Sequence, residues 1–307
     1  MSNQHSRTVG YLFALAAGAT WGTTGPLSTA VYAEGGQLTQ VGFWRVMLAT
    51  AGFAVYGLLF HRDLFKIDKK GLLLITIGGG LLVALFELAF QFAIAGVGVA
   101  GAVALLYTAP VIVAVLGYLL LKEALTPFRL ALAVVVMLGV ALTVNGESGH
   151  ASVANVTKVS GVIGGLLAAL SYTGTTLLAR YTVPRYGAQR VLFYELLGGT
   201  LVLALVVPLI SGPFTPPATV DGWIYIAALG IGAVLAANFF FFAAVKRIDA
   251  APTAVAASIE PFVGATLALL LFNQRITALG WLGLVLVVAG VAAGYRAESA
   301  QAPQAPA

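Results

Sequence analysis

Residues 109–126 read APVIVAVLGYLLLKEALT, and residues 260–277, 151 positions later, read EPFVGATLALLLFNQRIT. The similarity extends outward from these stretches without a gap, so that residues 71–145 align with residues 222–296, with 18 of 75 pairs identical. The identical pairs include glycine, phenylalanine, proline and threonine landmarks: Gly79/Gly230, Phe90/Phe241, Pro110/Pro261, Thr126/Thr277 and Gly139/Gly290. Landmarks in register over this length indicate two copies of one structural unit.

The composition predicts an all-α integral membrane protein. Hydrophobic residues make up 60% of the chain and charged residues 9%, whereas soluble domains carry about 25% charged residues. The apolar residues form runs of about 20, long enough for a helix to cross a hydrocarbon layer of about 30 Å. We expect ten transmembrane helices, at residues 10–30, 41–60, 71–93, 100–121, 127–145, 160–179, 191–211, 222–243, 251–272 and 278–295.

Each copy contains five of these runs, which is an odd number. The second copy must therefore enter the membrane from the side opposite to the first, which gives an inverted repeat of the kind common in secondary transporters. The predicted organisation is a cytoplasmic lead (1–9), a first five-helix repeat (10–150), a second five-helix repeat (151–296) and a disordered cytoplasmic tail (297–307).

The basic residues favour one orientation. With the N-terminus in the cytoplasm, 13 lysines and arginines fall on the inner side, only Lys158 and Arg275 on the outer side, and Arg45 inside a run. This bias follows the positive-inside rule. We therefore expect a multi-pass protein of the inner (plasma) membrane with both termini cytoplasmic. The orientation in the lipid bilayer then explains the excess of basic residues, and we expect no nucleic-acid partner.

Residue types that catalysis and metal binding need are missing from the runs. The chain has no cysteine, and its three histidines (His5, His61 and His150) lie in a tail or in loops. No aspartate and no histidine falls within a run, although intramembrane proteases use paired Asp, Ser with His, or zinc. We expect no metal, no cofactor and no enzymatic activity.

The repeated motifs resemble those of a known family. The first copy carries Ala109-Pro110-Val111, a Leu-Leu-Leu-Lys-Glu-Ala-Leu-Thr stretch at 119–126 and Gly139-Val140; the second carries Glu260-Pro261-Phe262, Leu-Leu-Phe-Asn-Gln-Arg-Ile-Thr at 270–277 and Gly290-Val291. With Trp21-Gly22 in the first run, the chain resembles the EamA branch of the drug/metabolite transporter superfamily. It departs from the pattern at Gln274 and Ala109, where that family has glutamate. The resemblance implies ten helices and export of amino acids or related metabolites.

Four ionisable residues lie within the runs: Arg45, Glu87, Glu195 and Glu260. Because charge in a bilayer is costly, each is a functional candidate. Glu260 lies near the middle of its run, directly before Pro261. It could bind a substrate ammonium group or exchange a proton; the alternative is a neutral or paired glutamate that bridges two helices.

The other polar candidates are related by the repeat. Glu87 corresponds to Asn238, and the two could contact a central substrate from above and below or simply form interhelical hydrogen bonds. Arg45 corresponds to Glu195. Arg45 could receive a substrate carboxylate, lock an outer gate to Glu87, or extend to the lipid headgroups.

Three aromatic residues complete the candidate site: Trp21 and Tyr172, at corresponding places in the first and sixth runs, and Tyr107, one turn ahead of the proline motif. They could line an apolar pocket or hold a cation; the alternative is packing or the interfacial aromatic belt. Residues 96–101 match G-x-G-x-x-G, but they join two apolar runs and follow no strand, so we expect a tight hairpin there.

Together these features predict a secondary active transporter of small organic metabolites, an exporter of amino acids or related compounds. It would work by alternating access at a site near Glu260, with coupling to protons. Another substrate class (sugar, carboxylate or cationic drug) and a facilitative, channel-like permease remain alternatives. Monomer and homodimer are both open.

Overall fold

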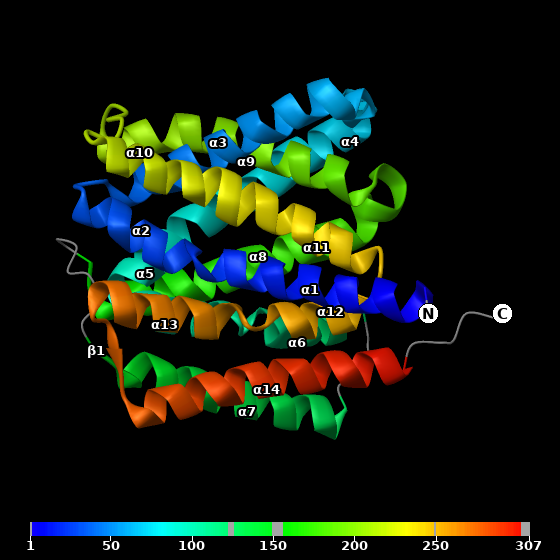
Figure 1. The fold of residues 1–307 in the computed structure, drawn as a ribbon, viewed down its shortest axis with the longest axis vertical. Coiled ribbons are helices and arrows are strands. Elements are labelled where there is room, and N and C mark those ends of the chain that lie inside the picture. The colour runs from blue at the N-terminus through cyan, green and yellow to red at the C-terminus, as the bar shows by residue number, and fades with distance from the viewer. Residues whose placement is uncertain (1, 122–125, 149–155, 249, 302–307) are drawn as a thin grey trace.

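The computed structural model describes residues 2–121, 126–148, 156–248 and 250–301, and helices occupy all ten apolar runs (Figure 1). The elements of the first half are α1 (Ser2–Gly22), α2 (Thr24–Ala33), α3 (Leu38–Phe60), the 3-10 turn η1 (Arg62–Phe65), α4 (Lys69–Leu73), the π-helical η2 (Leu74–Gly79), α5 (Gly80–Leu106), α6 (Ala109–Leu121), α7 (Pro127–Gly146) and β1 (Glu147–Ser148). Those of the second half are α8 (Lys158–Tyr186), α9 (Ala188–Ser211), α10 (Val220–Ala227), the π-helical η3 (Ala228–Ala236), α11 (Ala237–Val245), α12 (Ala250–Ala257), α13 (Glu260–Phe272), β2 (Arg275–Ile276) and α14 (Ala278–Gln301).

Within the described ranges, six helical stretches are long and apolar enough to cross a membrane by length and composition. Two further apolar helices, Leu130–Gly146 and Ala278–Gly294, are shorter. The six stretches are Leu38–Phe60, Lys69–Leu106, Lys158–Tyr186, Ala188–Ser211, Val220–Val245 and Pro252–Phe272. The chain is therefore a multi-pass helical membrane protein.

Three of the apolar runs are divided into two half-helices. The first divides at Thr23, the fourth at Tyr107 and Thr108, and the ninth at Ser258 and Ile259. In the fourth and ninth runs the second residue of the new half-helix is a proline, Pro110 in α6 and Pro261 in α13. Proline lacks the backbone N–H and clashes with the carbonyl four residues earlier, so the helix ends before it. The uninterrupted helices expected over 10–30, 100–121 and 251–272 are corrected accordingly.

The hairpin expected at residues 96–101 is confirmed. Gly98, inside α5, has φ 75° and ψ 179°, and the chain reverses there. Only glycine adopts this conformation without strain, because it has no Cβ to meet the following carbonyl. The third and fourth runs therefore share one element label but lie on either side of a turn.

Glycines allow the helices of the two halves to pack closely. A methyl group added at Gly96 in α5 would lie 2.6 Å from Cα of Gly161 in α8, and one added at Gly139 in α7 would lie 2.7 Å from the carbonyl oxygen of Gly283 in α14. Small residues at such crossings are typical of membrane helices. Figure 1 shows α7 and α14 side by side along one edge of the bundle. Next to them β1 pairs antiparallel with β2, Glu147 opposite Ile276.

The two ends of the chain extend further as helix than expected. Helix α1 begins at Ser2, inside the predicted lead, and α14 continues to Gln301, so residues 297–301 of the predicted disordered tail are helical. At the C-terminal end the reason is that no proline interrupts residues 278–302, and Ala297 to Gln301 contain good helix formers. In Figure 1 the start of α1 and the end of α14 lie at the same end of the bundle.

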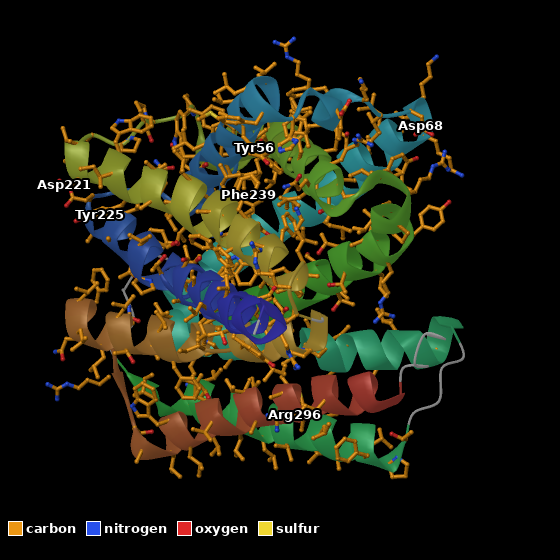
Figure 2. The ribbon with its side chains drawn as sticks, turned by 45° about the vertical axis from the view of Figure 1, so that its right-hand side comes forward. Tyr56, Asp68, Asp221, Tyr225, Phe239 and Arg296 are labelled. Carbon is orange, nitrogen blue, oxygen red and sulfur yellow. The ribbon has the colours of Figure 1, made fainter. Side chains whose placement is uncertain are left out.

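The interior is apolar and aromatic. One core cluster centres on Phe53 of α3, whose ring packs edge-on against Phe193 of α9 and Phe239 of α11. Figure 2 shows Tyr56 and Phe239 pointing toward each other, with ring centroids 4.7 Å apart. The same view places Asp68 and Asp221 at opposite ends of the bundle.

Candidate functional site

Glu260 and Tyr107 meet where two half-helices begin. Glu260 is the first residue of α13, and Tyr107 lies in the interruption before α6. The Tyr107 hydroxyl donates to Oε2 of Glu260 at 3.3 Å, and both side chains are half-buried. The start of each half-helix carries a partial positive charge from its unpaired N–H groups. The site therefore combines a carboxylate, a phenol and two helix dipoles.

Helix α1 lies directly on this interruption. A methyl group at Gly18 would lie 2.1 Å from the carbonyl oxygen of Ala257, and one at Gly22 would lie 2.7 Å from that of Glu260. Trp21, between the two glycines, is half-buried, and its ring lies tilted against that of Phe241 with centroids 5.4 Å apart. Trp21 thus belongs to the same region as Glu260, although its ring contacts α11.

Arg45 and Glu87 form a buried ion pair between α3 and α5. Arg45 Nε lies 3.3 Å from Glu87 Oε2, and the residues are 5% and 4% exposed. The predicted alternative that Arg45 extends to the lipid headgroups is wrong, because the guanidinium is buried and pairs with Glu87. Arg45 Nη1 is also buried and has no hydrogen-bond partner among the residues that the structure describes.

Two polar residues that sequence reasoning missed adjoin this pair. The Tyr32 hydroxyl of α2 donates to Oε1 of Gln91, which is fully buried in α5. Tyr32 also lies within the electrostatic field of Arg45 and Glu87. Gln91 follows Glu87 by four positions, which places both on one helix face, and this spacing could have revealed it.

The ion pair and Glu260 lie at different depths. Tyr32 follows the interruption at Thr23 by nine residues, which is about 14 Å of helix rise. Arg45 and Glu87, next to Tyr32, therefore stand about one half-helix away from Glu260. The structure does not bring Arg45 and Glu260 together around one small ligand.

The remaining candidates lie apart from both groups. Asn238 donates to the carbonyl of Val234 in its own helix at 2.7 Å and is half-buried. Tyr172 is 51% exposed on α8, 6.4 Å from the ring of Phe86. Glu195 is 7% exposed in α9, and its Oε1 has no hydrogen-bond partner within the described ranges. Glu195 is therefore buried without the contacts that Glu87 and Glu260 make.

Gln274, where the family resemblance led us to note a departure from glutamate, caps a helix. Its Oε1 accepts from the backbone N–H of Val99 at 3.3 Å, and the side chain is 1% exposed. Val99 is the first residue after the reversal at Gly98, so the amide satisfies one of the free N–H groups at the start of the following helix. A glutamine performs this task as well as a glutamate, because only one acceptor oxygen is needed.

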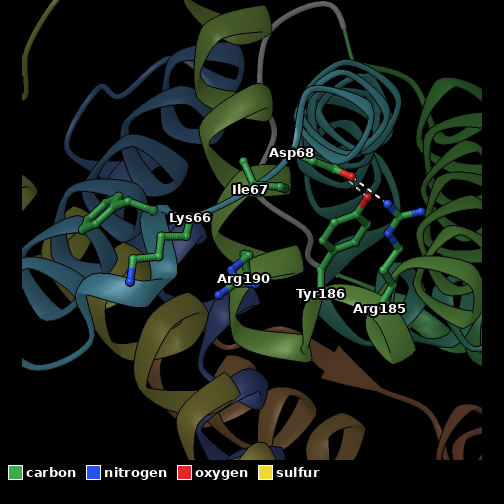
Figure 3. A pocket seen from close by; sticks show the side chains of 7 residues that line it. Lys66, Ile67, Asp68, Arg185, Tyr186 and Arg190 are labelled. Carbon is green, nitrogen blue, oxygen red and sulfur yellow. Dashed lines mark hydrogen bonds and ion pairs between the residues drawn. The ribbon is translucent and has the colours of Figure 1, made fainter.

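An open cavity of about 660 Å³ lies at the basic end of the bundle (Figure 3). It joins the segment between α3 and α4 to the junction of α8 and α9. Asp68 is its acidic member: Oδ1 accepts from the Gly71 N–H at 2.7 Å and the Tyr186 hydroxyl at 2.8 Å, and Oδ2 from Arg185 at 2.7 Å. We call Asp68, Arg185 and Tyr186 the ionic clasp. The cavity is lined by Phe65, Lys66, Ile67, Asp68, Arg185, Tyr186 and Arg190.

The bonds of the ionic clasp lower the pKa of the Asp68 carboxyl below its ordinary value of 3.8, the Gly71 N–H first and the Tyr186 hydroxyl next. A lowered pKa means that the stabilisation is complete above the ordinary pKa and is lost as pH falls through the lowered one. We therefore expect Asp68→Asn to reduce the melting temperature at neutral pH and to lose this effect below about pH 3. Thermal unfolding in detergent at both pH values measures it.

The control is Asp63→Asn, because the hydrogen-bonded ion pair of the Asp63 carboxylate is with Lys66, three residues away, at 2.7 Å, and both side chains are exposed. It should change the melting temperature less than Asp68→Asn does. Equal effects for the two variants at neutral pH would contradict a bridging role for Asp68.

The opposite end of the bundle is joined by uncharged donors. The backbone N–H and the hydroxyl of Thr215 both donate to Oε1 of Gln40 at 2.8 Å, and Thr39 donates to the hydroxyl of Ser211 at 2.7 Å. The Thr219 hydroxyl donates to Glu34 at 2.9 Å. These bonds link the α2–α3 connection to the α9–α10 connection. This neutral clasp (Thr39, Gln40, Ser211, Thr215) is the counterpart of the ionic clasp in the repeat, because each joins one connection of the first half to one connection of the second half at its own end of the bundle.

Comparisons with known proteins agree with this architecture. The EamA-like transporter family matches residues 8–145 and again residues 159–294. The pseudopaline exporter CntI from two strains of Pseudomonas aeruginosa is 28% identical over 200 residues, which is 65% of this chain and 66% of the exporter. A solved crystal structure matches 96% of this chain and 100% of its own with a TM-score of 0.65 at 19% identity, which shows a shared fold. The two matched regions cover most of the chain and confirm the predicted resemblance: it belongs to the EamA-like transporter family.

Proposed function

We propose that this protein is a secondary active transporter that exports small organic metabolites of the amino-acid type. The observation that carries the proposal is the meeting of Glu260 and Tyr107 at two helix interruptions, with α1 seated against them. Interrupted helices whose half-helix ends face a central site are the usual way in which secondary transporters bind polar solutes. The similarity to CntI, an exporter of pseudopaline, supports the direction.

The proposed membrane arrangement has ten spans in two inverted repeats. In the first repeat, span 1 consists of α1 and α2, span 2 of α3, span 3 of α4, η2 and α5 up to Gly98, span 4 of the rest of α5 and α6, and span 5 of α7. In the second repeat, span 6 consists of α8, span 7 of α9, span 8 of α10, η3 and α11, span 9 of α12 and α13, and span 10 of α14. The reversal at Gly98 separates two spans that length and hydropathy alone count as one. Both termini lie in the cytoplasm, on the side of the ionic clasp, where basic residues gather.

At the proposed site, the substrate ammonium binds the Glu260 carboxylate and its carboxylate faces the start of α6. Tyr107 positions Glu260 through its hydrogen bond. Trp21 borders the apolar side of the site. A zwitterion fits this arrangement because a carboxylate and a helix dipole can each meet one of its charges. Sugars and phosphorylated solutes fit less well, since the described residues of the site offer one carboxylate and no basic side chain.

Access from the outer side is closed by the Arg45–Glu87 pair together with Tyr32 and Gln91. The pair lies about one half-helix nearer the outside than Glu260 in the proposed orientation, and it is almost inaccessible. Opening this side requires the pair to separate or to move as a unit. The function assigned here to Arg45 and Glu87 is therefore that of an outer gate.

Counterflow in proteoliposomes tests the proposal. Labelled amino acids, polyamines and small carboxylates are offered to vesicles preloaded with the same unlabelled compound. One class should give saturable counterflow, and Glu260→Gln should reduce it at least about tenfold, because a charge-assisted contact contributes about 1.5–3 kcal/mol. Tyr107→Phe should reduce it by a smaller factor, since it removes one hydrogen bond and leaves the carboxylate.

The matched control is Glu34→Gln, which changes the same residue type on the outer surface, where Glu34 accepts from Thr219. It should leave counterflow close to that of the unmodified protein. Flux without saturation or counterflow would instead support a channel-like permease. Silence across the panel with folded protein would overturn the amino-acid class, and unaltered counterflow in Glu260→Gln would remove Glu260 from the site.

A further inference from the structure

Among the four ionisable residues of the spans, Glu195 alone is left without a defined bonding partner. Arg45 and Glu87 pair with each other, and Glu260 accepts from Tyr107. Glu195 is 7% exposed, and its Oε1 is buried with no hydrogen-bond partner in the part of the chain that the structure describes. A buried carboxylate without a partner costs several kcal/mol, so this group needs a cation or must be neutral.

The surroundings of Glu195 are shaped by the π-helical segment η2. A methyl group at Gly79 would lie 2.6 Å from Cγ of Glu195, and one at Gly198 would lie 1.8 Å from the carbonyl oxygen of Thr76. Gly79 follows Thr76 by three residues in η2, and Gly198 follows Glu195 by three in α9, so the two faces are in direct contact. The Thr76 hydroxyl is also buried and has no hydrogen-bond partner among the described residues. π-helical turns often mark functional positions.

No charge on the neighbouring elements compensates Glu195. Helix α9 packs against α3, α5, α8, η1 and η2. Among the described residues, no lysine or arginine forms an ion pair with Glu195 within 4.0 Å. The other ionisable side chains on α9 and these elements are Arg45, Tyr56, Arg62, Asp63, Glu87, Lys158, Tyr172, Arg180, Tyr181, Arg185, Tyr186, Arg190 and Tyr194. Of the cations, Arg45 is held by Glu87, Arg185 by Asp68 and Arg190 by the carbonyl of Asp63.

The repeat explains why the counter-charge is missing. Glu195 corresponds to Arg45, and Gly79 to Gly230, where a methyl group would lie 2.7 Å from the Arg45 carbonyl oxygen. The two positions are therefore packed alike. In the first repeat, Arg45 has Glu87 as its partner. In the second repeat, the residue that corresponds to Glu87 is Asn238, and its amide bonds to Val234 in its own helix instead of to Glu195.

We propose that Glu195 is the binding site of the coupling ion and that this ion is a proton. A proton needs no further ligands, whereas a metal cation would need several oxygens and the described surroundings offer one unpartnered hydroxyl. Binding forms one O–H bond on the carboxylate and makes it neutral, and release to the cytoplasmic side breaks that bond when α9 separates from η2. The inference rests on the proposed function as a gradient-driven exporter.

The first test is infrared difference spectroscopy on the full chain in lipid, between about pH 5 and pH 9. We expect a titrating carboxylic-acid C=O band that is absent in Glu195→Gln, displaced in Glu195→Asp and still present in Glu260→Gln. A band unchanged in Glu195→Gln would overturn the proposal. Binding of radioactive sodium that is lost in Glu195→Gln would overturn the choice of a proton.

The second test uses the solute found by counterflow. The counterflow rate of the unmodified protein should change with pH, that of Glu195→Gln should be flat, and that of Glu195→Asp should change at a displaced pH. A loss of folding would lower the rate without flattening its pH profile. If no solute gives counterflow, the proposed function fails, yet the infrared bands still decide whether Glu195 titrates.

Discussion

Replacing Arg45 by methionine is expected to destabilise the protein by about 3–5 kcal/mol, because Glu87 is left buried without its partner. Glu87→Gln alone should have an effect of similar size, since it strands the guanidinium instead. The double variant Arg45→Met/Glu87→Leu removes both charges and fills the space with apolar groups. We expect its free energy of unfolding to lie within about 1 kcal/mol of that of the unmodified protein.

The expectation follows from the burial of the pair. Both groups are at most 5% exposed, so the loss of hydration on folding is nearly complete for each. Their mutual attraction offsets much of that cost, and either charge left alone loses the attraction while keeping the cost. Reversible unfolding with increasing SDS in mixed micelles measures the two single variants and the double variant as a cycle. Additive effects would show that the two charges do not stabilise each other.

The double variant also tests the gate. If the pair only stabilises the fold, the double variant should transport the counterflow substrate as the unmodified protein does. If the pair holds the outer side shut, the double variant should exchange solute faster, because no ion pair has to separate. A slower rate in a fully folded double variant would assign the charges to substrate binding.

Gly198→Ala is expected to destabilise the protein by about 3 kcal/mol, at the upper end of the usual cost of overpacking. The added methyl group would lie 1.8 Å from the carbonyl oxygen of Thr76, far inside contact distance. That neighbour is backbone, so it cannot rotate away as a flexible side chain does. Helix α9 must therefore move from η2, and the surroundings of Glu195 open to solvent.

The matched control is Gly78→Ala, in the same π-helical segment, where an added methyl group meets nothing within 4 Å. Alanine there should be neutral or stabilise by up to about 1 kcal/mol, because glycine is the poorer helix former. Both substitutions replace glycine by alanine, but Gly198→Ala is expected to lower the free energy of unfolding and Gly78→Ala to leave it unchanged or raise it. Equal unfolding free energies for both variants would show that the contact between α9 and η2 does not constrain the fold.

The family and the helical membrane class were predictable from the sequence because they depend on patterns that the whole chain carries. Long apolar runs and a register kept between residues 71–145 and 222–296 survive many individual substitutions. The hairpin at Gly98 was also predictable, since residues 96–101 join two apolar runs and follow no strand. The interruption at Thr23 was not predictable from the sequence. Pro26 falls in the first turn of α2, where a proline fits the helix, so its presence alone does not show where the preceding helix ends.

Contacts of the candidate site depend on helix rotation and depth, which a one-dimensional pattern does not contain. The sequence identifies Arg45 and Glu87 as functional candidates, but it leaves their pairing as one of several possible arrangements. Tyr172 stands at a place corresponding to that of Trp21 and yet is 51% exposed. Asn238 bonds within its own helix although its repeat counterpart Glu87 does not. Divergence between the two copies thus changes which residues a polar side chain contacts, although the side chains stay at corresponding positions of the repeat.

That divergence has an energetic consequence for the transport cycle. Two identical copies related by inversion would give an inward-open and an outward-open conformation of equal free energy, because exchanging the copies exchanges the states. The pair formed by Arg45 and Glu87 has no equivalent at Glu195 and Asn238. We therefore expect the two conformations of the proposed transporter to differ in free energy, with the empty protein resting with its Arg45 side shut and the reopening of that side as the slow step of the cycle.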